Sequence, residues 1–226
     1  MIKNSITFSK IYAEDRLALF FLFILLSLLV FVFIGPYFTL QNPYDLTQLS
    51  ILDSIMPPMS KSLDDKFFYL GTDDQGRDLV SAIIYGLRIS LFVGFLSVII
   101  ALFIGIVLGI ISAYFGGFID SIIMRIADMV LAMPSFLIAL VLLSILGRGL
   151  ENVIIALVMS QWATFARVIR SSALSEKEKD YFNSAKSLCL PQHRIIFGHL
   201  LPNCLPPIIV LSTMNLAFAI TLEASL

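Results

Sequence analysis

The chain has 226 residues, a formal net charge of −1 and a hydrophobic share of 58%. Its charged share of 14% lies well below the value of about 25% that is typical of globular proteins. The charge balance excludes a strongly basic nucleic-acid-binding protein, and the composition excludes an ordinary soluble domain. We predict instead an all-α protein that crosses the membrane several times, because each spanning helix satisfies its own backbone groups in lipid.

The first apolar run occupies residues 17–37 and follows Lys3, Lys10 and Arg16. About 20 apolar residues cross a bilayer as a helix, whereas the apolar part of a cleaved signal peptide has about 7–15 residues. We therefore predict a cytoplasmic N-terminus at 1–16 and a retained first transmembrane helix at 17–37.

Residues 38–88 are more polar, and acidic residues outnumber basic ones among them. They contain the stretch YLGTDDQGRD at 69–78. A calcium loop needs acids at its first, third and fifth places, and setting Gly76 at the sixth place puts Gly71 at the first. This disfavours calcium, and we expect Asp73 and Arg77 to cap and orient the end of the segment.

Four further apolar runs lie at 89–114, 122–146, 152–169 and 205–226. Lys and Arg mark cytoplasmic loops, and they gather before the first run and again between the fourth and fifth. The second group consists of Arg167, Arg170, Lys177, Lys179, Lys186 and Arg194. We predict an external segment at 38–88 and a transmembrane domain at 89–226 with a cytoplasmic loop at about 170–204.

The second run carries small residues at every fourth position. Such a stripe allows another helix to approach closely, where van der Waals packing drives association in lipid. The alternative is that small residues are simply common in membrane helices. We favour a packed interface formed by Ser97, Ala101, Gly105, Gly109 and Ala113.

Three ionisable residues fall within the last spans, namely Arg125, Asp128 and Glu223. Such groups are costly in lipid and usually face a bundle interior or a water path. Arg125 and Asp128 are spaced i, i+3 and are expected to pair with each other, in preference to a role toward substrate. Glu223 either contacts a transport path or reaches water at the end of its span. The two cysteines and two histidines match no metal-ligand spacing, so no metal is predicted.

The stretch 180–203 is polar and lies between two apolar runs. Its apolar residues recur at helical spacing and form one stripe. Pro191 ends this helix or begins the next one. The residues alone leave two readings open, a helix on the membrane surface and a helix in the groove of a partner. The stripe consists of Tyr181, Phe182, Ala185, Leu188 and Cys189.

This stretch resembles the cytoplasmic loop of permease subunits of binding-protein-dependent ABC importers. Their motif reads E-A-A, three residues, G, nine residues, I-x-L-P. Here Asn183, Ser184 and Ala185 take the opening positions, Cys189 the glycine position and His199 the isoleucine position, before Leu201 and Pro202. Asn183 and Cys189 therefore depart from the family's acid and glycine.

Other blocks extend the resemblance from residue 68 to the end of the chain, and they are closest to the dipeptide, oligopeptide and nickel branch. They are RISLFVG at 88–94, AYFGGFID at 113–120, MRIADMVLAMPSFLIAL at 124–140 and NVIIAL at 152–157. The branch also has a G-T-D-x-x-G-R-D motif before the second span. That motif falls here on Gly71, Thr72, Asp73, Gly76, Arg77 and Asp78.

The resemblance implies a helical bundle of the ABC importer permease type, with five of about six spans present. It implies that the 180–203 loop docks on a cytoplasmic ATPase, with Ser184, Ala185 and Cys189 at the contact centre and Tyr181, Asn183, His199, Leu201 and Pro202 around it. It further implies a second permease as heterodimer partner, two ATPase subunits and an external solute-binding protein. It places this chain in the inner membrane of the cell.

The expected cargo is a dipeptide or oligopeptide, with nickel as the alternative. The sequence has no G-x-x-x-x-G-K-[ST] loop to hold nucleotide phosphates, so ATP is expected to be used by the partner and this chain to bind no cofactor. Two further hypotheses are a truncated, non-transporting remnant or scaffold of such a system and, much less favoured, a membrane enzyme. ATP-dependent uptake would separate the permease from the scaffold.

Overall fold

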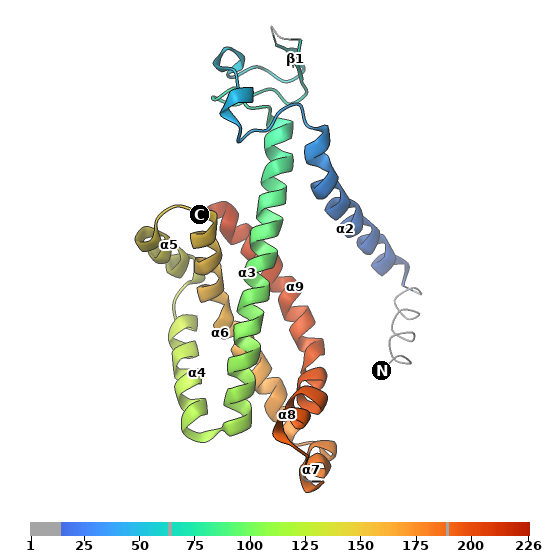
Figure 1. Ribbon diagram of the computed structural model, residues 1–226, viewed down its shortest axis with the longest axis vertical. Helices are drawn as coiled ribbons and strands as arrows, with labels where there is room; N and C mark the ends of the chain where they lie inside the picture. The colour runs from blue at the N-terminus through green and yellow to red at the C-terminus, as the bar shows by residue number, and fades with distance from the viewer. Residues whose placement is uncertain (1–14, 63–64, 189) are drawn as a thin grey trace. The chain divides into compact units, whose positions relative to one another are not determined.

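The computed structural model describes residues 15–62, 65–188 and 190–226, without the side chains of Asn183 and Lys186. Most of the predicted cytoplasmic N-terminus and Cys189 therefore lie outside the described residues. The chain divides into two compact units, Met1–Ile89 and Ser90–Leu226. Among the described residues, four helices are long and apolar enough to cross a membrane, or five spans if the bent pair α4–α5 is counted as one (Figure 1).

In the first unit, α2 (Arg16–Ile34) agrees with the predicted first span. Asp15 caps its first turn by accepting hydrogen bonds from the backbone of Leu17 and Ala18. Within α2 only Val32 is buried, so the helix presents apolar side chains on all sides, as a lipid-facing helix does. Pro36 follows in the 3₁₀ turn η1 (Gly35–Phe38), where its ring and missing N–H prevent the α-helix from continuing.

The rest of the first unit is a set of short turns held by polar contacts. It contains two 3₁₀ turns, η2 (Leu46–Gln48) and η3 (Ile51–Asp53). Two short antiparallel strands follow, β1 (Ser60–Lys61) and β2 (Phe67–Phe68), with Ser60 opposite Phe68. The helix α3 (Leu79–Phe115) then begins before the predicted residue 89, because small and polar residues at 79–88 lower the hydropathy without preventing a helix.

In the second unit, α6 (Leu150–Lys177) is the central helix and contacts α4, α5 and α9. Of its most apolar 18-residue window 56% is buried, against 17% for the span that includes α9. Small side chains let its neighbours approach closely. A core cluster of Ala127, Trp162, Ala163 and Ala166 joins it to α4.

The third apolar run does not form the single helix that we predicted at 122–146. It is divided into α4 (Gly117–Leu131) and α5 (Ser135–Leu146), which meet at an angle of 90°. Pro134 stands at the break and precedes α5. Proline disfavours the α conformation in the residue before it, so α4 ends ahead of Met133.

The predicted loop at 170–204 is largely helical. The helix α6 extends to Lys177, so Arg170 and Lys177 lie on a helix rather than in a loop. After α7 (Asp180–Ser187) and a turn at Pro191 come α8 (Gln192–Ile195), the π-helical turn η4 (Ile196–Leu200) and α9 (Leu201–Ser225).

The last span therefore begins well before residue 205, where we predicted it. Pro202 lies in the first turn of α9, and Pro206 and Pro207 lie inside the helix. Each proline removes one backbone donor from the helical ladder, and the π-helical turn lies directly ahead of them. The helical segment nevertheless continues through all three prolines.

Candidate functional site

The helix α7 carries the predicted amphipathic stripe, and two of its apolar side chains lie inside the protein. Phe182 is 1% exposed and Ala185 is 5% exposed, while α7 contacts α6 and α8. We expected the stripe to enter the groove of a partner, but these two side chains are covered by the chain itself. Leu188, further along the stripe, is 74% exposed.

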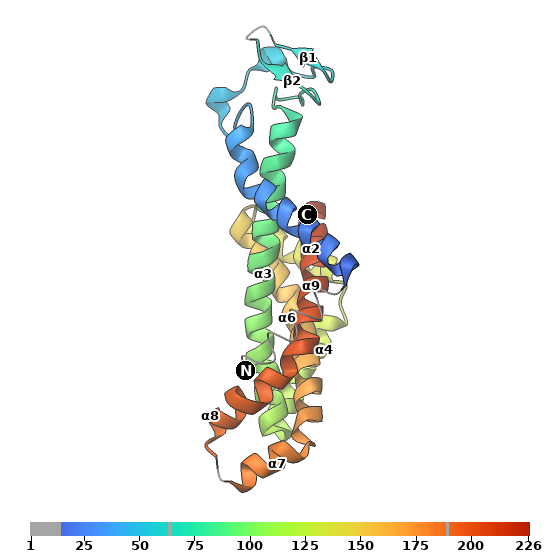
Figure 2. The ribbon, with the colours of Figure 1, turned by 90° about the vertical axis from the view of Figure 1, so that its right-hand side faces the viewer.

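A second face of α7 and of the following turn is open. Ser184 is exposed, and its hydroxyl donates to the backbone oxygen of Asp180 in the same helix, at 2.9 Å. Figure 2 shows α7 and α8 together at one end of the second unit. We call this the exposed loop face, and its residues are Ser184, Leu188, Gln192, His193, Arg194 and Phe197. Exposed apolar side chains with a polar and basic surround are typical of a protein contact surface.

Tyr181 ties α7 to two other helices. Its hydroxyl donates to Oε2 of Glu176 at 2.6 Å, and it accepts from Nδ2 of Asn203 at 3.2 Å. Glu176, which is 8% exposed, also accepts from Nζ of Lys179 at 2.7 Å. Burial and the hydrogen bond to Glu176 raise the pKa of Tyr181 to about 12, so the hydroxyl stays protonated at physiological pH.

The end of the resembled motif lies at the junction of η4 and α9. His199, Leu201 and Pro202 are half-buried there. The backbone oxygen of His199 accepts from Nδ2 of Asn203 at 2.7 Å. Nearby prolines have no N–H to donate to the helix, so this side-chain bond adds a contact at the beginning of α9. His199 therefore forms part of a helix start, while Tyr181 and Ala185 lie on α7.

Two ion pairs join α4 to α6. Arg170 contacts both carboxylate oxygens of Asp120, through Nε at 2.5 Å and through a terminal nitrogen at 2.6 Å. Ser112 of α3 also donates to Asp120. Asp128 pairs with Arg167, and not with Arg125 as the i, i+3 spacing suggested, because the long Arg167 side chain reaches across from α6.

The third of the predicted intramembrane ionisable residues, Glu223, lies near the end of α9. Its Oε2 accepts from the hydroxyl of Ser90 on α3 at 2.7 Å. This bond links α3 to the end of α9 at Ser90, the first residue of the second unit. Glu223 is half-buried, and its position on a path for substrate stays a prediction.

The small-residue stripe of α3 faces α6 of the same chain at two positions. A Cβ atom at Gly105 would lie 2.3 Å from Cβ of Phe165, and one at Gly109 would lie 2.7 Å from the backbone oxygen of Ala166. The other members of the stripe, Ser97, Ala101 and Ala113, are at most 1% exposed. The stripe therefore serves packing inside the chain.

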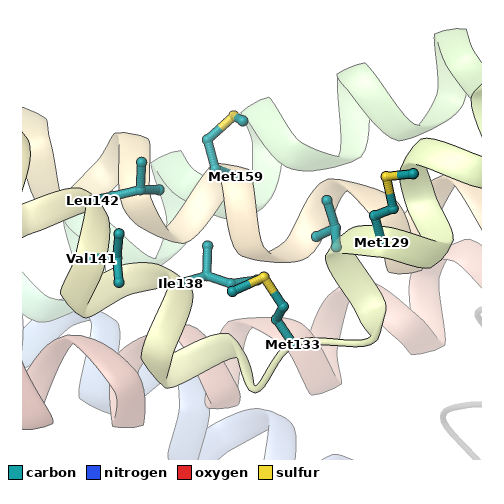
Figure 3. Close-up of a pocket in the computed structure, with 7 residues that line it drawn as sticks. Met129, Met133, Ile138, Val141, Leu142 and Met159 are labelled. Carbon is teal, nitrogen blue, oxygen red and sulfur yellow. The ribbon is translucent and has the colours of Figure 1, made fainter.

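A shallow apolar groove of about 270 Å³ lies where α4, α5 and α6 meet (Figure 3). Its lining side chains are all apolar and thus offer a peptide no charged or hydrogen-bonding group. For this reason we do not assign the groove to a hydrophilic cargo. It is lined by Met129, Val130, Met133, Ile138, Val141, Leu142 and Met159.

In the first unit, the two glycines of the G-T-D-x-x-G-R-D stretch allow close backbone approach. Gly71 has φ +82°, and a Cβ there would lie 2.3 Å from the backbone oxygen of Met56. Gly76 has φ +73°, and a Cβ there would lie 2.1 Å from the backbone oxygen of Ser50. Both conditions favour glycine, so these positions fix a compact turn.

The polar residues of the same stretch hold the turn and begin α3. Thr72 donates to the backbone oxygen of Asp53 and accepts from the backbone of Met56 at 2.9 Å. Arg77 contacts Asp73 at 2.6 Å. We expected Asp73 and Arg77 to cap the next span, but the cap is Asp78, which accepts from the backbone of Ser81 at 2.8 Å.

Replacing Asp73 with Asn is expected to loosen this turn at neutral pH by about 1–2 kcal/mol, the value of charge-assisted hydrogen bonds. Burial acts to raise the pKa of Asp73, but hydrogen bonds from Arg77 and Gln75 outweigh it and hold the pKa below its usual value. The stabilisation is therefore present above the unfolded pKa and lost as pH falls through the folded pKa. Limited proteolysis of the 39–78 segment across pH 3–7 measures it, and equal cleavage of both proteins at pH 7 would contradict it.

The sequence did not reveal which residues join the helices. Arg170 and Lys177 stood out only as members of a basic group, and Glu176, Asn203 and Asp120 were not singled out. One signal was present in the spacing of charges. Asp120 pairs with Arg170 and Asp128 with Arg167, so the order along one helix reverses along the other, as in an antiparallel helix pair. Nothing comparable in the sequence marks Glu176 as a partner of Tyr181.

The chain is similar to known membrane proteins over most of its length. Residues 105–226 match the family described as binding-protein-dependent transport system inner membrane component. A dipeptide transport system permease protein of Haemophilus influenzae is 37% identical over 95% of this chain and 72% of its own length. A dipeptide permease of Bacillus subtilis is 37% identical over 94% of this chain and 64% of its own length. An oligopeptide permease of the same organism is 34% identical over 95% and 68%, respectively.

Proposed function

This chain belongs to the family of binding-protein-dependent transport system inner membrane components, and we propose that it is a permease subunit of an importer that carries dipeptides or oligopeptides into the cell. The relatives named above are dipeptide and oligopeptide permeases, which supports peptides over nickel as cargo. Helices that suit a bilayer support a pathway built from membrane spans.

The energy for import comes from a separate protein. The sequence has no G-x-x-x-x-G-K-[ST] loop for nucleotide phosphates, so two ATPase subunits on the cytoplasmic side hydrolyse the ATP. A second permease completes the pathway as a heterodimer, and an external solute-binding protein delivers the peptide. The distribution of Lys and Arg supports an inner-membrane orientation with the N-terminus in the cytoplasm.

We propose that the exposed loop face is the surface that contacts the ATPase, because it has exposed apolar side chains. Leu188, in the turn directly after α7, is 74% exposed, and Phe197 in η4 is 68% exposed, although α7 and η4 both contact the central helix α6. Exposed apolar side chains in such a position suit insertion into a groove of a partner. We assign this face to the ATPase, with Ser184 beside Leu188, and leave the buried Phe182 and Ala185 to hold the helix in place.

Co-purification of an ATPase and a second permease with this chain from its native membrane tests the proposal. The wild-type chain is expected to retain both partners, whereas Leu188→Glu loses the ATPase and keeps the second permease, because a charge at the centre of an apolar contact is desolvated without a partner. Leu52→Glu is the matched control, since Leu52 is 82% exposed and belongs to the first unit, outside the exposed loop face. Loss of neither partner in Leu188→Glu would contradict the assignment of this face.

The cargo is tested with the assembled complex in vesicles that contain ATP. Uptake of a labelled dipeptide in the presence of the solute-binding protein is the expected result, and an excess of unlabelled dipeptide competes with it. Nickel uptake that dipeptide does not reduce would overturn the peptide assignment. Absence of ATP-dependent uptake from a complete assembly would favour the non-transporting scaffold.

A further inference from the structure

Consecutive residues at the end of α6 connect to different helices. Glu176 accepts from Tyr181 of α7 at 2.6 Å, and Lys177 donates to the backbone oxygen of Ala113 near the end of α3 at 2.6 Å. Two turns earlier, Arg170 contacts Asp120 of α4. The end of α6 is therefore attached by directional polar contacts to α3, α4 and α7.

The hydrogen bond between Glu176 and Tyr181 of α7 continues to α9 through Asn203. The Tyr181 hydroxyl donates to Glu176 and accepts from Asn203 of α9, so its one donor and an acceptor site are both used. Asn203 in turn donates to the backbone of His199 in η4. One hydroxyl group thus joins α7 to the end of one span and to the start of the next.

We infer that Tyr181 is a positioning residue that transmits displacement of α7 to α6 and α9 together. The inference rests on the proposed function, in which α7 belongs to the surface that the ATPase moves. Through Lys177 and Arg170, α3 and α4 follow the end of α6. The hydroxyl of Tyr181 thereby makes the loop and four long helical segments respond as one body.

The chemistry of this contact suits transmission better than the apolar contacts beside it. Phe182 and Ala185 attach α7 by burial, which is non-directional and tolerates sliding. The bond to the Glu176 carboxylate is charge-assisted, directional and stronger than a neutral hydrogen bond. Since burial and Glu176 raise the pKa of Tyr181 to about 12, the donor is present throughout the physiological pH range.

Tyr181→Phe separates attachment from transmission, because it removes the hydroxyl and keeps the ring. Phe182, Ala185 and the exposed loop face are unchanged in this variant, so the ATPase is expected to remain bound and to hydrolyse ATP. Peptide uptake per ATP hydrolysed is expected to fall about tenfold, which corresponds to the loss of one hydrogen bond to a charged group. The measurements are uptake, ATPase rate and co-purification on the same vesicles of the full complex.

Matched variants identify the cause of the loss. Thr213→Val removes a hydroxyl of α9 that donates only to the backbone of Val210 in the same helix, at 2.8 Å, and is expected to keep the wild-type uptake per ATP. Glu176→Gln weakens the same bond from its other side and also lowers uptake per ATP. Combining it with Tyr181→Phe is expected to cost less than the product of the two separate losses, since both remove one interaction.

The outcomes distinguish this inference from the proposed function. If the wild-type complex does not assemble or import peptide, the proposed function fails first. If the wild type imports and Tyr181→Phe keeps its uptake per ATP, the hydroxyl has no role in transmission. If Tyr181→Phe and Glu176→Gln both fail to accumulate, or lose ATPase binding in proportion to uptake, the contact is merely structural, and the inference is overturned.

Discussion

Alanine in place of Gly105 is expected to destabilise the protein by about 3 kcal/mol, near the upper end for overpacking of a tight core. The new Cβ would lie 2.3 Å from Cβ of Phe165 and 3.0 Å from the backbone nitrogen of Ala166. Neither atom is the end of a flexible side chain, so α3 and α6 must separate. The single tryptophan, Trp162, lies in the core cluster of α6, and its fluorescence during thermal unfolding in detergent measures the loss.

Gly86→Ala is the matched control on the same helix. A Cβ at Gly86 meets nothing within 4 Å, and alanine in a helix interior is more stable than glycine by about 0.5–1 kcal/mol. The two identical substitutions are therefore expected to act in opposite directions. Equal unfolding temperatures for both variants would show that α3 and α6 are not in close contact at Gly105.

Arg170→Gln is expected to cost about 2–3 kcal/mol, because it leaves Asp120 without its cation. Removing one partner of a fully buried pair costs about 3–5 kcal/mol, and this pair is partly exposed, with 30% of the Arg170 side chain and 21% of the Asp120 side chain accessible. The same unfolding measurement applies. The double variant Asp120→Asn, Arg170→Gln is expected to be more stable than Arg170→Gln alone, since no unpaired charge remains.

The second ion pair between α4 and α6 supplies the comparison. Arg167 and Asp128 have 51% and 62% of their side chains exposed, and exposed pairs contribute about 0–1 kcal/mol. Arg167→Gln is therefore expected to change stability little. A loss as large as that of Arg170→Gln would mean that burial does not distinguish the two pairs.

The positions of the spans followed from hydropathy because lipid requires long apolar helices. The helix α6 contains the predicted run at 152–169, and α2 contains most of the run at 17–37. The ends of the spans did not follow, since a helix continues past the apolar part wherever polar residues tolerate it. This is why α3 begins at Leu79 and α6 continues to Lys177. Pro134 is a helix breaker, but we predicted one span at 122–146 because the residues around it are apolar.

Pairing across helices was the least predictable part of the site. The stripe of Phe182 and Ala185 identified an apolar face, but periodicity cannot say whether the same chain or a partner covers that face. Asp128 illustrates the same limit, because its neighbour in sequence, Arg125, and its neighbour in space, Arg167, are both arginines. Spacing along one helix reports local proximity, whereas these contacts depend on how α4, α6 and α7 are placed.

The right angle between α4 and α5 has a consequence for the area that the protein occupies in each leaflet. The 15 residues of α4 rise about 22 Å at about 1.5 Å per residue, less than the hydrocarbon core of about 30 Å. With α4 along the membrane normal, α5 lies flat and adds its width of about 10 Å, which completes the depth. The 12 residues of α5 then displace lipid from one leaflet only. In this orientation α5 widens the second unit in that leaflet, so lateral pressure in the two leaflets acts unequally on the α4–α5 pair.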